Sequence, residues 1–246
     1  MKIGIIGAGA IGSTLAQRLS AAGHDVTIAN SRGPETIDPA TLSTGATAAW
    51  AAEVVTGADV VIVSVNLGQV PDVATLIHQA PAAAVIIDTS NYYPLRDGII
   101  EAIENGEVES LWVQDHYQRP VAKAWNSIVS TSFADKATKP GSLDRIALPV
   151  AADDAAHRTL AMALVEDTGF DAFDAGTLTD SWRQQPGTPA YCTDLTADPL
   201  SSALAKADAR YSARRRDLVW EVVSERAAAE GTVQGNYLVA LNRAIY

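Results

Sequence analysis

The chain has little of what several classes of protein need. It contains one cysteine, Cys192, so it cannot form an internal disulfide, and this usage fits a reducing, cytoplasmic compartment. No apolar run approaches the roughly 18 residues that span a membrane. Only 18 basic side chains stand against 29 acidic ones. The net charge of −11 argues against nucleic acid or an anionic membrane as a partner, because both attract a positive field.

Sequence motifs for several common chemistries are also missing. The four histidines have no helical metal-site spacing and Cys192 has no cysteine partner, so no metal site is predicted. There is no Gly-x-Ser-x-Gly nucleophile motif and no P-loop lysine motif. The length of 246 residues, 48% of them hydrophobic, suits one large domain or one domain with a smaller appendage. A small-molecule substrate is the partner class that remains.

The first thirty residues predict a strand, a tight turn, a helix and a second strand. Residues 2–6 are β-branched and apolar, as in a buried parallel strand, residues 13–22 have helical periodicity, and residues 25–29 form the second predicted strand. Four glycines interrupt the early apolar run, which argues against a secretion signal.

The turn between strand and helix carries the pattern Gly-x-Gly-x-x-Gly. Gly7 permits the tight turn, Gly9 lets a pyrophosphate approach the backbone, and Gly12 lets the helix pack closely on the strand. A pyrophosphate there is favoured by the free N–H groups at the helix N-terminus. The predicted dinucleotide site is therefore the whole turn, Gly7, Ala8, Gly9, Ala10, Ile11 and Gly12.

The residues after the second strand select the cofactor. NAD sites usually have Asp or Glu there to bind the ribose 2′-hydroxyl, whereas this chain has Asn30, Ser31 and Arg32. Ser31 can donate a hydrogen bond to a 2′-phosphate and Arg32 can pair with its charge. We therefore expect NADP(H) rather than NAD, although Arg32 can also be read as an ordinary surface arginine.

The alternation of strands and helices continues along the chain. Further strands are predicted at residues 59–65, 84–88, 121–124, 145–150 and 170–174, with a helix at 153–168 and one or two helices within 203–230. This pattern predicts an α/β fold of the Rossmann type, with a doubly wound, mainly parallel sheet and a small helical C-terminal part. We divide it into an NADP-binding domain, residues 1–178, and a substrate-pocket loop with C-terminal helices, residues 179–246. Because ligands bind at the carboxyl ends of such strands, residues 64–66 and 89–91 should lie along the cofactor.

Three further features have two readings each. Trp182, Arg183 and Tyr191 lie in a loop rich in proline and amides, which either stacks on a flat substrate ring or plugs the seam beneath the C-terminal helices. Lys123 is either a catalytic acid or base or, as is more common at a strand end, a solvated lysine. The arginines at 210 and 214–216 form either a solvated face paired with nearby acids, which we favour, or an anion-binding site.

Four segments resemble the NADPH-dependent 8-hydroxy-5-deazaflavin (coenzyme F420) reductases and their bacterial subgroup. The segments are GIIGAGAIGSTLAQRLSAAGHDVTIANSR, DVVIVSV, VIIDTSNYYP and VAKAWNSI. They cover about the first 130 residues, and the resemblance continues more loosely through RIALPVA and GFDAFDAG. It implies a Rossmann domain, a C-terminal part that helps form the substrate pocket, and a homodimer. It also implies NADP(H) as cofactor and 8-hydroxy-5-deazaflavin (F420) as co-substrate.

The resemblance carries over residue by residue. Residues 7–12 would hold the pyrophosphate, and Ser31 and Arg32 the 2′-phosphate. Ser64 and Val65 would lie against the ribose and nicotinamide, with Asn91 nearby. Asn126 and Ile128 would lie beside the nicotinamide and deazaflavin rings, with Asn126 as the orienting residue. Two alternatives stay open: reduction of a small carbonyl or imine, and a non-catalytic NADP-binding sensor.

Overall fold

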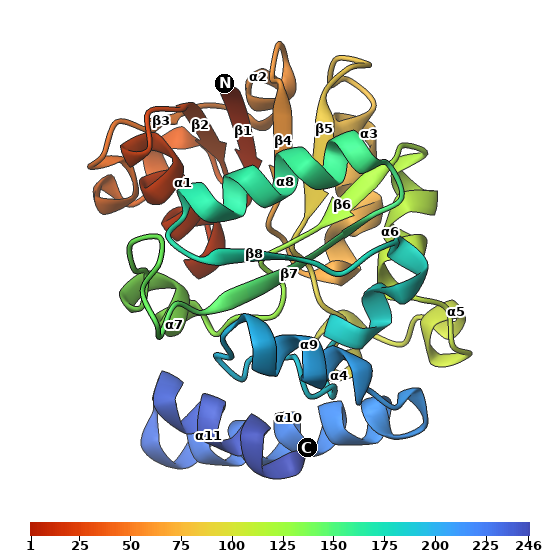
Figure 1. Ribbon diagram of the computed structural model, residues 1–246. Coiled ribbons are helices and arrows are strands. Elements are labelled where there is room, and N and C mark those ends of the chain that lie inside the picture. Colours follow the sequence, from red (N-terminus) through yellow and green to blue (C-terminus); the bar gives the residue numbers. More distant parts are fainter.

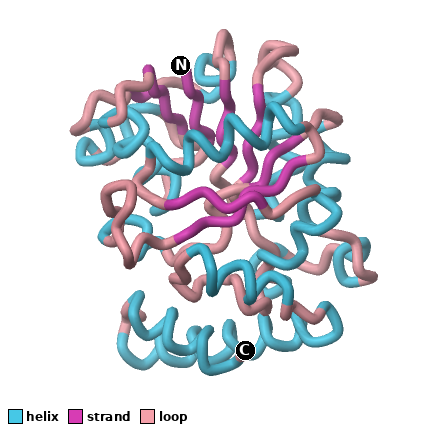
Figure 2. The backbone as a smooth tube through the Cα atoms, viewed as in Figure 1, coloured by secondary structure: helices cyan, strands magenta, loops and turns pink.

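Short runs of β-branched and apolar residues form one eight-stranded sheet in the computed structural model, which describes residues 1–246 (Figures 1 and 2). All neighbouring strands are parallel except β6 and β7, which are antiparallel. The strands are β1 (Lys2–Ile6), β2 (Asp25–Ala29), β3 (Thr47–Ala48), β4 (Val60–Val63), β5 (Val85–Asp88), β6 (Val121–Lys123), β7 (Ala147–Ala152) and β8 (Asp171–Asp174).

The strand order is β3-β2-β1-β4-β5-β6-β7-β8, so β1 lies between β2 and β4. The chain adds β2 and β3 on one side of β1, and then crosses back to add β4 on the other side, so the direction of strand addition reverses at β1. Such a reversal opens a crevice at the carboxyl ends of the strands, and this is where ligands bind in open α/β sheets.

Helices cover both faces of the sheet because the strands are apolar on both sides. Every residue of β4 is buried, for example. One face packs against α1 (Ala10–Ala21), α7 (Ser130–Asp135) and α8 (Ala155–Asp167), with α8 running across the front of the sheet in Figure 1. The opposite face packs against α2 (Ala51–Val55), α3 (Val70–Ile77) and α6 (Glu109–Tyr117).

The remaining helices follow the strand ends and the C-terminal part. α4 (Pro94–Asp97) and α5 (Glu101–Glu104) are single turns between β5 and α6. α9 (Ala197–Ala205), α10 (Ala209–Glu230) and α11 (Gly235–Ile245) form the blue layer at the bottom of Figure 1. None of these helices combines the length and the apolar character that crossing a membrane requires.

The α/β class and the doubly wound, mainly parallel sheet predicted from the sequence are confirmed, with strand ends that differ by one or two residues. The first helix begins at Ala10 rather than 13, because the last residues of the glycine turn already form its first turn. The segment 203–230, predicted as one or two helices, contains the end of α9 and all of α10, and the Asp208 side chain caps α10 by accepting from the Arg210 N–H. β3, α11 and the helices of the second face had no prediction. All strands precede residue 178, and the domain division there remains a proposal.

Candidate nucleotide-binding site

The three glycines of the turn after β1 differ in their surroundings. Gly7 has φ +107°, and a Cβ there would overlap the carbonyl oxygen of Ser64. A Cβ on Gly12 would overlap the carbonyl oxygen of Gly7, which shows how closely α1 approaches the turn. A Cβ on Gly9 would meet nothing within 4 Å. The geometry therefore agrees with the separate roles of turn, close packing and open approach that the sequence predicts.

A cleft of about 820 Å³ opens over this turn at the carboxyl ends of the strands. The first N–H groups of α1 have no partner within the helix and can bind an anion in the cleft. Most of the predicted cofactor residues line it: Gly7, Ala8, Gly9, Ala10, Ile11, Asn30, Ser31, Arg32, Ser64, Val65 and Asn91. Gly12, Asn126, Ile128, Trp182, Arg183 and Tyr191 do not line it.

The turn after β2 is ordered by the amide of Asn30. Its oxygen accepts hydrogen bonds from the N–H groups of Arg32 (2.9 Å) and Gly33 (3.0 Å). Its nitrogen donates to the Thr36 hydroxyl at 2.8 Å. Ser31 and Arg32 are exposed, and the Arg32 guanidinium makes no ion pair or hydrogen bond within the protein. Arg32 is therefore available to an anionic group at this end of the cleft.

The predicted orienting residue, Asn126, needs a correction. It is buried, and its amide nitrogen donates to the Asn91 side-chain oxygen (3.1 Å) and the Gln184 carbonyl (2.9 Å). Its amide oxygen accepts from Gln184 at 2.9 Å. Asn126 thus holds Asn91 in place, and Asn91 is the amide that faces the cleft. Ile128 is buried in the hydrophobic core rather than exposed at the cleft.

The loop at 181–192 is mostly packed inside the molecule. Tyr191 is buried, and its hydroxyl shares a 2.8 Å hydrogen bond with the hydroxyl of Tyr93. Trp182 is half-buried, with the guanidinium of Arg183 4.5 Å from its ring centroid. Of the two readings of this loop, the structure favours the second at Tyr191, whose ring packs with Val129 and with Val239 of α11.

Two charged residues lie deeper than the sequence suggested. Lys123 is wholly buried rather than solvated, and its Nζ lies 2.6 Å from the carboxylate of Asp88. Arg216 is buried rather than part of a solvated face: it lies over the ring of Tyr92 at 4.9 Å and pairs with Glu104 at 3.2 Å. Both groups could be buried because an acid from another element meets each of them.

Glu109, at the start of α6, is a buried acid that sequence reasoning missed. Burial raises the pKa of its carboxyl from the ordinary 4.5 to about 7, against the opposing effects of Lys123, the N–H of Tyr92 and Arg216. Its carboxylate accepts from the Tyr92 N–H at 3.1 Å. No periodicity signals such a residue, because its neighbours come from elements far apart in the chain.

Arg96 is a further cleft residue that the sequence did not indicate. Arg96 lies in the short helix α4. Its guanidinium donates to the Asn91 carbonyl at 2.6 Å and to both carboxylate oxygens of Asp97 at 2.9 Å. It lines the cleft beside Asn91. The only signal in the sequence is its position a few residues after a predicted strand end.

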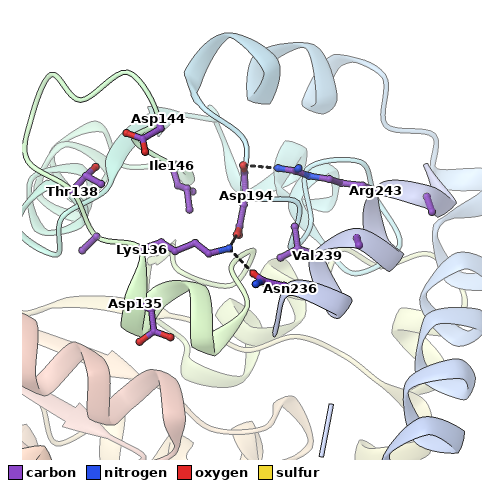
Figure 3. A pocket seen from close by; sticks show the side chains of 12 residues that line it. Asp135, Lys136, Thr138, Asp144, Ile146, Asp194, Asn236, Val239 and Arg243 are labelled. Carbon is purple, nitrogen blue, oxygen red and sulfur yellow. Dashed lines mark hydrogen bonds and ion pairs between the residues drawn. The ribbon is translucent and has the colours of Figure 1, made fainter. Parts of the chain in front are cut away.

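A second cleft, of about 880 Å³, lies between α7 and α11 (Figure 3). There the amine of Lys136 donates to Asp194 at 2.9 Å and to Asn236 at 3.1 Å, and Arg243 donates to the backbone carbonyls of Thr193 and Asp194. Figure 3 shows these side chains turned toward one another. They join α11 to the rest of the molecule. No group of three or more metal-binding side chains occurs there or elsewhere.

Comparison with known proteins relates the first cleft to a family. Residues 2–92 match the family model described as NADP oxidoreductase, coenzyme F420-dependent. This N-terminal part of the chain is therefore similar to these oxidoreductases. The resemblance inferred from the sequence motifs is thereby confirmed, and the matched segment contains the glycine turn, the end of β2 and Asn91.

Individual relatives extend the comparison. The protein YjhV of Escherichia coli K12 is 48% identical over 63 residues, which are 26% of this chain and 46% of YjhV, so the match spans less than half of that relative. The hypothetical protein SMa0349 of Sinorhizobium meliloti is 28% identical with a TM-score of 0.69, over 80% of this chain and 96% of that one. A provisionally named F420-dependent NADP reductase of Arthrobacter sp. FB24 has the same fold, at 22% identity and a TM-score of 0.60, over 74% and 87% of the two chains.

Proposed function

We propose that this protein binds NADP(H) in the first cleft and transfers a hydride between NADPH and an acceptor, and that the acceptor is an 8-hydroxy-5-deazaflavin of the coenzyme F420 type. The membership of residues 2–92 in an NADP oxidoreductase family supports the cofactor. The single observation that favours this acceptor is the chemistry of the cleft lining, described below.

The residues present fit NADP(H). Gly9 leaves open space over the N-terminus of α1, which a side chain would fill, and a pyrophosphate fits there. Ser31 and the unpaired guanidinium of Arg32 would hold a 2′-phosphate at the end of β2. No carboxylate stands at that position to repel it. When bound, the cofactor supplies the hydride.

The sheet sets the direction of the bound dinucleotide. From β2 the order β1, β4, β5 covers three inter-strand spacings, about 14 Å. With the 2′-phosphate at β2 and the pyrophosphate at β1, the nicotinamide end reaches β4 and β5. Ser64, Val65 and Asn91 line the cleft there. They would orient the nicotinamide and exclude water from one side of it.

The lining has few groups that could transfer a proton. Arg32, Asp72 and Arg96 are its only ionisable side chains, and it contains no histidine, lysine, tyrosine, cysteine or glutamate. Reduction of a small carbonyl or imine calls for a positioned acid near the reacting atom. Hydride transfer between two stacked rings depends mostly on their position and on exclusion of water. The lining therefore favours a flat ring acceptor.

The test follows the absorbance of a deazaflavin during reaction with NADPH and the purified protein, beside NADPH oxidation with a panel of small carbonyls and imines. Turnover of the deazaflavin alone is the expected result. Turnover of a carbonyl or imine alone would refute the acceptor but keep the oxidoreductase. Tight binding of NADPH without turnover of any acceptor would instead support an NADP-binding sensor. The Gly9→Ala variant serves as the control for activity that does not depend on the cleft.

We further propose that the protein is a cytoplasmic homodimer, as the family resemblance and the single, buried Cys192 suggest. Light scattering coupled to gel filtration tests the dimer. A mass near 25.8 kDa, that of one chain, would refute it.

A further inference from the structure

A buried ion pair lies directly beneath the nicotinamide end of the cleft. Asp88 and Lys123 are register partners at the ends of β5 and β6, and neither side chain is exposed. Their charged atoms are 2.6 Å apart. Lys123 is the only buried lysine of the chain. Burying such a pair is expensive, and replacing one with apolar groups of similar size is often neutral or stabilising. The Asp88–Lys123 pair is therefore expected to have a role other than stabilising the fold.

The Asp88–Lys123 pair binds the backbone of Ser90, a residue that lines the cleft. The Ser90 carbonyl accepts a short hydrogen bond from the Lys123 amine. The Ser90 N–H and hydroxyl donate to the Asp88 carboxylate at 3.3 and 3.0 Å. Every polar atom of Ser90 thus binds one of two buried charges. The next residue but one, Tyr92, donates its N–H to the buried Glu109.

Asn91 lies between these two anchored residues and carries the only side-chain amide of the segment 89–91 that lines the cleft. Its amide donates to the Asn126 carbonyl at 2.8 Å, which leaves its position sensitive to where Ser90 is held. Lys123 does not line the cleft and cannot touch a ligand there. It can act on a bound ligand only through the Ser90–Asn91 backbone.

We propose that Lys123, paired with Asp88, is a positioning residue that fixes the Ser90 carbonyl and thereby places Asn91 against the nicotinamide end of the cofactor. The proposal rests on the proposed use of NADP(H) in this cleft. Without the ammonium group the Ser90 carbonyl loses its donor and the segment can shift. A displacement near 1 Å at a reacting centre lowers the rate by about 100-fold.

The adenosine end of the cleft should not respond, because Arg32 and the glycine turn follow β2 and β1, whereas Lys123 and Asp88 end β6 and β5. This separation gives a binding readout that does not depend on turnover. Adenosine 2′,5′-bisphosphate reports on the adenosine end alone, whereas NADPH also reports on the nicotinamide end. The ratio of their dissociation constants therefore measures the nicotinamide contribution.

The main variant is Lys123→Met, which keeps the length of the side chain and removes its charge. Because it leaves Asp88 unpaired in the interior, the double variant Lys123→Met/Asp88→Asn accompanies it, with an amide that can still accept from Ser90. Lys136→Met is the matched control: it makes the same change at a lysine paired with Asp194 in the second cleft. Thermal melting of each variant shows whether it is folded.

We expect the folded Lys123 variant, single or double, to bind the bisphosphate as the native protein does. The ratio of the bisphosphate Kd to the NADPH Kd should fall about tenfold, as when NADPH loses one hydrogen-bonded contact, and turnover should fall with it. Lys136→Met should leave the bisphosphate Kd, the ratio of the two Kd values and the turnover unchanged. An unchanged ratio with unchanged turnover would overturn the proposal, as would an equal loss of both ligands, which indicates a purely structural role. If the native protein binds neither ligand, the proposed function fails instead.

Discussion

The glycine turn offers the sharpest prediction, because two of its glycines face opposite surroundings. A Cβ on Gly12 would overlap the Gly7 carbonyl oxygen, and would lie 3.0 Å from the Gly7 carbonyl carbon and 3.4 Å from Ser64 Cβ. A Cβ on Gly9 would meet no protein atom within 4 Å. Gly12→Ala adds a methyl group at a crowded position inside α1, and Gly9→Ala adds the same group at an open position at the N-cap of that helix.

The magnitude for Gly12→Ala follows from what must move. The obstacle is the backbone carbonyl of Gly7, so the start of α1 must retreat from the turn after β1 by about 1 Å or more to restore ordinary contact distances. Overpacking of this kind costs about 1–3 kcal/mol. In a chain of this size each kcal/mol lowers Tm by about 2–4 °C, which gives a fall on the order of 2–12 °C. The retreat also displaces the N–H groups that face the pyrophosphate, so NADPH binding weakens too.

Gly9→Ala should separate the two effects. Its backbone, with φ −78° and ψ −173°, is open to alanine, so the free energy of unfolding should change by no more than a few tenths of a kcal/mol. NADPH affinity should fall about ten- to 100-fold, since hydrogen bonds to a charged group contribute about 1.5–3 kcal/mol. The assays are thermal melting without ligand and fluorescence titration with NADPH. An unchanged affinity in Gly9→Ala, or an unchanged Tm in Gly12→Ala, would refute this account of the turn.

Three further substitutions test the two ends of the cleft and the charge beneath it. Arg32→Ala should weaken NADPH binding by about 10- to 100-fold and spare NADH, because only NADPH offers a 2′-phosphate; equal losses in parallel titrations would contradict this. Asn126→Ala should lower turnover with a nearly unchanged Kd for NADPH, because Asn91 loses one side-chain contact but keeps its hydrogen bond to the backbone carbonyl of residue 126, so it is loosened rather than displaced; normal turnover in a steady-state assay would remove it from the site. Glu109 has its pKa raised to about 7 chiefly by burial, so the folded state keeps a proton that the unfolded state loses near pH 4.5. The free energy of unfolding therefore falls by about 3 kcal/mol as the pH rises from 4.5 to 7, because the folded state comes to bury a charged Glu109. In urea unfolding, Glu109→Gln should be more stable than the native protein at pH 8 but not at pH 5. A difference between the two proteins that does not depend on pH would contradict this prediction.

Local sequence was enough to predict the strands and the glycine turn. β4 is a continuous apolar run, and β1 and β5 each have only one charged residue, at one end of the strand; such runs are buried wherever the rest of the chain goes. The roles of Gly7, Gly9 and Gly12 depend on contacts within one strand–turn–helix unit and its neighbouring strand. Arg32 could be placed at one end of the cleft because it comes only three residues after β2. These features need no knowledge of distant parts of the chain.

The features that were misread depend on distant partners. Lys123 looked like a solvated strand-end lysine because nothing nearby in the sequence could neutralise it, and its partner, Asp88, lies 35 residues away. Asn126 looked like a free polar edge, but Gln184, 58 residues later, takes up its amide. Arg216 found Glu104 across 112 residues. In each case the strand register or helix docking, which the local pattern does not encode, decides whether a polar group meets water or a partner.

The same distinction locates the determinants of the acceptor. The family match ends at residue 92, so it contains every residue that lines the first cleft except Arg96, and it stops before the residues from the second half of the chain that hold Asn91 in place. Asn126, which follows β6, contacts Asn91 directly, whereas Lys123 at the end of β6 acts through Ser90 and Gln184 beyond β8 acts through Asn126. Changes in the second half of the chain can therefore alter the geometry at the nicotinamide end without touching the cofactor site. With the proposed use of the first cleft, cofactor choice and acceptor choice would be separable, and the Lys123 variants, rather than any substitution in the glycine turn, should be the ones that change reactivity while the adenosine end stays intact.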